Sequence, residues 1–136
     1  MIKKLSPFQI HKAIKERVEA GTGLRCYDEV PENAESPFYF VELVGMIPDN
    51  TKTMWCDVYE IWVHAIAKPS KKSNQVYKLI NSLEEALTEA INLPPECDLI
   101  YQRGNGLQVL KSDETGEKHA IMAFQFKICY GFKIKV

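Results

Sequence analysis

The stretch Ala120-Ile-Met-Ala-Phe-Gln-Phe-Lys-Ile-Cys-Tyr-Gly-Phe-Lys-Ile-Lys-Val136 decides the fold. Every second residue in it is apolar or aromatic. Polar or small residues stand between most of these, and the exceptions are Ile121, Ala123 and Cys129. Such alternation predicts a β-strand with one buried face. The stretch is longer than most strands, so we expect a long curved strand or a bend at Gly131, where the absent side chain permits a bulge.

The length and composition are those of one ordinary globular domain, so we expect a single domain over residues 1–136. The net charge of -1 argues against a protein that binds nucleic acid through bulk positive charge. No apolar run reaches the length that spans a bilayer, and the segment Met1–Pro7 does not read as an export signal. The four cysteines form no C-x-x-C pair, so we expect free thiols in a reducing cytosol.

Two helices are predicted from apolar residues at three- and four-residue spacing. Ser6-Pro7 suits the start of the first helix, and Gly21-Thr-Gly23 suits its end. The second begins at Ser70 or Ser73 and runs to just before Pro94-Pro95. Its apolar stripe is the natural cover for the aromatic side of the last strand. The stripe comprises Val76, Leu79, Ile80, Leu83, Leu87, Ala90 and Ile91.

The remaining chain predicts strands joined by loops rich in polar and turn-forming residues. In the long strand Thr53–Ala67, Tyr59 and Trp62 fall on opposite sides. One side of this strand should be covered by a helix, while the other should be partly exposed or contact a partner. Gly104-Asn-Gly106 is interpreted as a tight turn, since it lacks the rest of a phosphate loop. This order predicts an α+β fold with a mostly antiparallel sheet and both helices packed on one face. The other expected strands are Leu24–Tyr27, Pro37–Val44, Asp98–Arg103 and Leu107–Lys111, with a hairpin loop at Ser112–Glu117.

No catalytic residue, metal ligand or cofactor site is predicted. None of His11, His64 and His119 stands at a metal-ligand spacing from another His or a Cys. On one strand, Cys56 and His64 would lie about 26 Å apart at roughly 3.3 Å per residue, too far for a nucleophile and its base. A cross-strand contact with Cys129 stays open.

The carboxylates do not predict a catalytic site either. Asp57 and Glu60 fall on opposite faces of their strand, and Glu42 could approach either of them from a neighbouring strand. Acids on a solvated sheet edge are a commoner arrangement than acids paired in a pocket, where they would point to function.

Two loops carry opposite charge. Asp28 to Glu35 is acidic, and Lys68, Lys71 and Lys72 form a basic corner. Solvated surfaces explain both loops, but opposite patches on a small domain also suit head-to-tail contacts between copies, which form rings where the rotation closes.

The element order and several phrases resemble the small tail-completion proteins of long-tailed bacteriophages and prophages, also called tail terminators or head–tail joining proteins. The likeness covers nearly the whole chain and rests on pattern rather than invariant residues. The chain departs from that pattern in placing Glu60 and His64 beside Trp62, where small polar residues are commoner. The resembling phrases are Val30-Pro31, Ser36-Pro37-Phe-Tyr-Phe-Val-Glu-Leu43, Tyr59-Glu-Ile-Trp-Val-His-Ala65, Ser70-Lys-Lys-Ser-Asn74 and the strand His119–Tyr130.

The resemblance implies a structural protein and not an enzyme. Its copies would form a ring, usually a hexamer, on the end of the tail tube. The partners implied are further copies, the tail-tube protein and the head-connector protein, with DNA passing through the ring and no membrane. The places implied are the bacterial cytoplasm during assembly and then the virion. We infer that three loops, Asp28–Glu35, Asp49–Lys52 and Ser112–Glu117, are free to order on assembly. The candidate interface residues are Asp28, Glu29, Glu32, Glu35, Asp49, Asn50, Lys52, Lys71, Lys72, Asp113 and Glu114.

Two other functions stay open on sequence grounds. A small cytosolic module could bind a peptide or small ligand in a pocket formed by Trp55, Tyr59 and Trp62. An enzyme could use a cysteine, or a histidine with a carboxylate.

Overall fold

A computed structural model describes residues 3–132 of the chain. The end of the predicted terminal strand, residues 133–136, lies outside this described part. The elements, in chain order, are α1 (Pro7–Thr22), β1 (Cys26–Tyr27), β2 (Phe38–Pro48), β3 (Met54–Ile66), α2 (Asn74–Ala86), β4 (Asp98–Ser112) and β5 (Lys118–Phe132).

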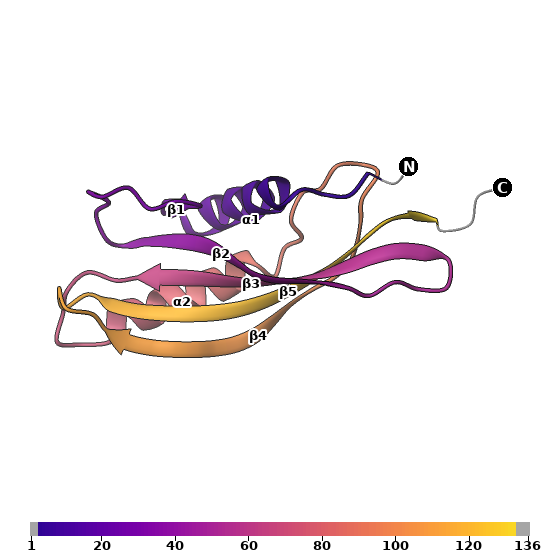
Figure 1. Cartoon of the computed structure of the whole chain (residues 1–136). Coiled ribbons are helices and arrows are strands. Elements are labelled where there is room, and N and C mark those ends of the chain that lie inside the picture. Colours follow the sequence, from indigo (N-terminus) through magenta and orange to yellow (C-terminus); the bar gives the residue numbers. More distant parts are fainter. Residues whose placement is uncertain (1–2, 133–136) are drawn as a thin grey trace.

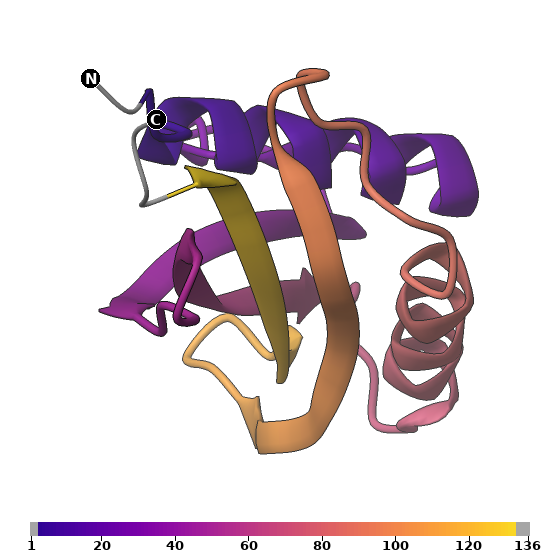
Figure 2. The same ribbon diagram turned by 90° about the vertical axis from the view of Figure 1, so that its right-hand side faces the viewer.

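In the described part, the strands form one sheet in the order β1-β2-β3-β5-β4. Only the short β1–β2 pair is parallel, and the other neighbours are antiparallel. The sheet is strongly curved, and α1 and α2 lie together on one side of it (Figures 1 and 2). The predicted α+β class with both helices on one face is therefore confirmed.

The helical face of the sheet holds the core. On β3, Tyr59, Ile61, Val63 and Ala65 all have no exposed surface, and the alternate residues of β5 from Ala120 to Tyr130 pack beside them. The apolar stripes of both helices belong to the same cluster. The period of two in the strands and the spacing in the helices therefore identified the core face correctly. The other face of β3 is less exposed than expected, because Val58, His64 and Ile66 are also buried, and Glu60 and Trp62 are half-buried.

The first helix has the predicted ends. The Ser6 hydroxyl accepts a hydrogen bond from the Gln9 N–H at 3.2 Å, and the Gln9 side chain accepts one from the Ser6 N–H at 2.9 Å. This reciprocal pair satisfies N–H groups that have no partner within the helix. At the other end Gly23 has a φ of 74°, a left-handed conformation in which glycine is favoured.

The second helix begins at Asn74, after Ser73, and ends at Ala86, well before the predicted end at Pro94-Pro95. The side chain of Gln102 on β4 binds the backbone that follows. Its amide donates to the carbonyls of Leu87 (2.9 Å) and Glu89 (2.7 Å), and its oxygen accepts from the Ile91 N–H (3.0 Å). These bonds satisfy the backbone of a turn and the irregular chain after it. Leu87 and Ile91 remain buried there, so the apolar spacing continues beyond the end of the helix.

Two glycine-rich sites differ in outcome. On β5 the register against β3 shifts between Cys129 and Gly131, so the bulge expected near Gly131 is present. The prediction for residues 98–111 was wrong, because Gly104–Gly106 does not turn the chain. β4 is one strand that contains bulges, and Gly106 takes a φ of 90° at one of them. β2 also runs further than predicted, through Pro48.

Candidate interaction surfaces

The strand register places the connecting loops at two opposite ends of the sheet. Ile66 of β3 is paired with both Phe38 and His119, and His119 is also paired with Lys111. The loops 28–37, 67–73 and 113–117 therefore gather at one end, which we call the loop end. At the other end β2 and β3 continue past the helices as a hairpin (Figure 1). We call residues 44–56 the hairpin arm.

The loop end brings together most of the predicted interface residues. A shallow hollow there is lined by Ala34, Glu35 and Ser36 from the acidic loop, Lys68 and Pro69 from the basic loop, and Glu117 from the β4–β5 turn. The acidic and basic loops thus form one surface of mixed charge. Asp28, at the start of the acidic loop, instead lies beside α1, where it lines a separate hollow with His11, Lys12 and Lys15. The predicted residues placed on these three loops, all exposed, are Asp28, Glu29, Glu32, Glu35, Lys71, Lys72, Asp113 and Glu114.

The β4–β5 turn at this end is ordered within the chain itself. The Asp113 carboxylate accepts hydrogen bonds from the Thr115 hydroxyl (2.6 Å) and from the N–H groups of Thr115 (3.0 Å) and Glu117 (3.1 Å). These donors lower the pKa of Asp113, with the Thr115 hydroxyl as the largest cause. This turn does not need assembly to acquire its shape.

The hairpin arm carries the other predicted residues, Asp49, Asn50 and Lys52, at its exposed tip. The tip is also ordered. The Asn50 side chain accepts from the Cys56 N–H at 2.8 Å, and Lys127 Nζ lies 3.1 Å from an Asp49 carboxylate oxygen. Below the tip the arm is apolar, and Met46 and Ile47 are 48% and 55% exposed. Exposed apolar side chains grouped on one projecting element indicate a contact surface.

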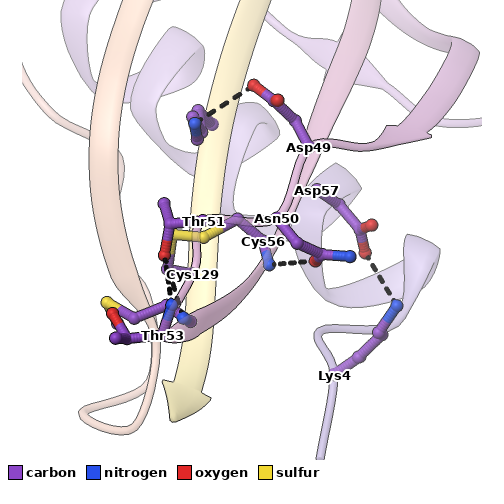
Figure 3. Close-up of a disulfide and its surroundings, with 10 residues drawn as sticks. Lys4, Asp49, Asn50, Thr51, Thr53, Cys56, Asp57 and Cys129 are labelled. Atoms are coloured by element: carbon purple, nitrogen blue, oxygen red, sulfur yellow. Dashed lines mark hydrogen bonds and ion pairs between the residues drawn. A yellow bond between two sulfur atoms is a disulfide. The ribbon is translucent and has the colours of Figure 1, made fainter. Parts of the chain in front are cut away.

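A disulfide between Cys56 and Cys129 joins the base of the arm to β5 (Figure 3). The expectation that all four cysteines are free was wrong, and only Cys26 and Cys97 are free. The two bonded cysteines face each other across the β3–β5 pair with Cα atoms 4.0 Å apart, yet they are separated by 73 positions in sequence. The spacing of the cysteines along the chain did not predict this pairing, because the pairing depends on which residues of β3 and β5 face each other.

The register also assembles a polar cluster that the sequence did not predict. On the sheet face away from the helices, His64 Nδ1 lies 2.7 Å from His119 Nε2, and His64 Nε2 lies 2.7 Å from a Glu42 oxygen. The Phe40 ring stacks on the His64 ring with centroids 4.0 Å apart. Burial lowers the pKa of both histidines, although the hydrogen bond that His64 donates to the Glu42 carboxylate partly opposes this for His64.

The remaining carboxylates do not form a pair. Asp57 is buried on the core side and lies 3.4 Å from Lys4 Nζ (Figure 3). Glu60 lies on the opposite face beside Gln125, with 3.3 Å between their side chains. Glu42 reaches His64 instead of either acid. No group of three or more His, Cys, Asp or Glu within residues 3–132 is arranged to hold a metal ion.

The three aromatic residues considered for a ligand pocket do not share one. Tyr59 is inside the core, where its hydroxyl is hydrogen-bonded to the Tyr130 hydroxyl and lies 3.1 Å from the Leu5 carbonyl. Trp55 is on the arm. Trp62 lines a hollow of about 270 Å³ on the outer face, together with Val44, Glu60, Asn105, Gln108, Ala123 and Phe124.

These features define the class of protein: an α+β domain whose distinctive parts are surfaces at the two ends of a curved sheet.

Among the described residues, no helix is long and apolar enough to cross a membrane. The sequence profile of a family described as "Putative tail termination protein" matches residues 1–136, so the chain belongs to this family of structural phage tail proteins. The family resemblance seen in the sequence is thereby confirmed.

One solved structure similar to this chain is described as "Virion of native gene transfer agent (GTA) particle". The TM-score is 0.72 at 13% identity, over 88% of this chain and 94% of that chain. At this identity the likeness establishes a shared fold. No curated protein matches the chain.

Proposed function

We propose that this protein ends the phage tail tube as a ring of identical copies and offers the other side of the ring to the head connector. The observation that carries the proposal is the family match over residues 1–136. The ring would be a hexamer through which DNA passes. It would assemble in the bacterial cytoplasm, without a membrane, and remain in the virion. The protein acts through contacts, without catalysis or a cofactor.

The two ends of the sheet support a role between different partners. The loop end is charged and hydrogen-bonded, whereas the hairpin arm is largely apolar below its tip. A ring between a tube and a connector needs two dissimilar surfaces, since it meets a different protein on each side. The resemblance of the fold to a chain from a gene transfer agent virion agrees with a place in such a particle.

Deletion of the reading frame from the parent phage or prophage tests the proposal. Electron microscopy should then reveal filled heads beside unattached tails, many of them with abnormal length. The wild-type gene supplied from a plasmid should restore joined particles. Normally joined particles in the deletion strain would refute the proposal.

Charge reversal tests the part played by the loop end. The variant E32K/E35K changes two exposed residues of the acidic loop and should prevent joining while the protein stays folded. The matched control E84K/E85K reverses two exposed charges on α2 and should join normally. If both variants join equally well, the acidic loop has no part in the interface.

A further inference from the structure

The sheet has two edges with unpaired backbone. β1 covers β2 only at Tyr39 and Phe40, so the outer side of β2 beyond Val41 has no strand partner in the described part of the chain. At the other side of the sheet, β4 is the last strand. Unpaired N–H and C=O groups on a strand edge are a template for another strand.

The two free edges lie at the same height on the sheet. Successive pairings place Ile47 level with Val58, Lys127 and Tyr101, and they place Gly45 level with Glu60, Gln125 and Arg103. Residues at one level of a sheet point to the same face. The arm edge at Gly45–Ile47 and the β4 edge at Tyr101–Arg103 therefore match in both height and face.

Strand direction also fits. Because β2, β3, β5 and β4 alternate in direction, β2 and β4 run opposite ways. A second copy related by rotation about an axis along the strands keeps those directions. Its β4 would then meet the arm edge as an antiparallel partner. Each copy has one edge of each kind, so the contact can repeat head to tail and close into a ring.

We propose that the arm edge Gly45–Ile47 of one copy pairs with the edge Tyr101–Arg103 of the next copy, which makes one sheet across the subunit boundary. The inference rests on the proposed ring and specifies its contact. The occupant is a second copy because this chain itself presents both matching edges.

The side chains and bulges at the two edges agree with this choice. Met46 and Ile47 are about half exposed on the arm, and Ile100, 51% exposed, adjoins Tyr101 on β4. Bulges usually protect edges from pairing. They interrupt β2 just before Gly45, and they interrupt β4 on either side of Tyr101–Gly104. Each edge thus keeps a short regular run at the same level, and the bulges restrict pairing to these runs.

A pair of introduced cysteines tests the contact. The variant I47C/Y101C, in a C97S background, places two thiols that should approach only between copies. Within one chain β3 and β5 separate these strands, so the Cα atoms lie roughly 14 Å apart at about 4.8 Å per strand, beyond disulfide reach. The matched control I47C/K111C keeps the thiol on the arm, so any thiol–disulfide exchange between that thiol and Cys56 is the same in both variants. It moves the second thiol roughly 25 to 30 Å along β4.

Tails purified from cells in which the variant is the only copy are oxidised and separated without reductant. A ladder of covalent oligomers from I47C/Y101C, and none from I47C/K111C, would support the pairing. Rings visible on the tails without a ladder would overturn the pairing and leave the proposed function intact. If the wild-type chain is absent from purified tails, the proposed function fails and the inference falls with it.

A second variant keeps the test decisive if the cysteine variants do not assemble. M46K places a charge beside the arm edge and should remove rings from tails without changing the urea midpoint of the isolated chain. The control Y77K changes a side chain of similar exposure (50%, against 48% for Met46) on α2, which packs on the inner strands β3 and β5, and should assemble normally. Normal ring formation by M46K would overturn the inference.

Discussion

The Cys56–Cys129 disulfide should contribute a large part of the stability of the isolated chain. It closes a loop across 73 positions, for which the loop-entropy relation gives about 4 kcal/mol at 25 °C. Residual structure in the reduced denatured chain lowers this, so we expect a measured loss of about 2 to 4 kcal/mol. The assay is urea unfolding of the wild type with and without reductant, and of the variant C56A/C129A without reductant.

Thiol counting and a control variant make this prediction sharp. The folded, untreated protein should contain two free thiols, Cys26 and Cys97, and four after reduction. The variant C97S should lose as much stability on reduction as the wild type does, because it keeps the disulfide. Reduction should also raise the urea m-value, since the denatured chain expands. Four thiols in untreated protein, or a loss below about 0.5 kcal/mol in both the reduced wild type and C56A/C129A, would refute the reasoning.

Three further predictions concern stability and reactivity. The pKa of His64 and that of His119 are lowered in the folded state, so the unfolded chain binds more protons than the folded chain does. The contribution of these histidines to stability should therefore be full above about pH 6.5 and be lost as the pH falls through the folded pKa values. Lys111, Glu42, Asp113 and Glu117 also act on this pair. Urea midpoints between pH 7.5 and 5 should therefore decline, and H64Q/H119Q should flatten the decline, whereas H11Q should not. The variant G21A should lose about 1 to 3 kcal/mol despite the better helix propensity of alanine, because its Cβ would lie 2.5 Å from the Ala86 Cβ. Unchanged thermal unfolding of G21A would contradict this. Burial raises the pKa of the Cys26 thiol to about 12, so iodoacetamide at pH 8 should label Cys97 alone in the folded protein, and mass spectrometry would reveal any labelling of Cys26.

Local signals in the sequence predicted most of the elements. The Ser6 cap, the Gly23 stop and the period-two alternation of β5 each depend on residues close together in the chain, and each lies where expected. The failures at residues 87–93 and 98–111 have a common cause. Gln102 binds the backbone after α2, and β4 pairs along its whole length with β5, so partners distant in sequence outweighed local turn and helix preferences.

The polar cluster and the disulfide could not be predicted in the same way. His64 and His119 are 55 positions apart, and Cys56 and Cys129 are 73 apart. If the β3–β5 register shifted by one residue, the two partners of each pair would lie on opposite faces of the sheet. Only the observed register brings them together. A prediction of that register from the alternating patterns of β3 and β5 would have offered the one available signal.

These contacts together explain why the hairpin arm continues the sheet as an ordered element. On the outer face, the Glu42–His64–His119 cluster links the strands near the loop end, and Glu60, Gln125 and Arg103 form a second row of hydrogen bonds. Near the arm, the disulfide and the Asp49–Lys127 ion pair link the same strands. Cross-strand links at three levels fix the height of the arm edge relative to β4. The proposed pairing between copies requires that height, because the two edges must lie at the same level. An arm already held in position also loses less conformational freedom on binding.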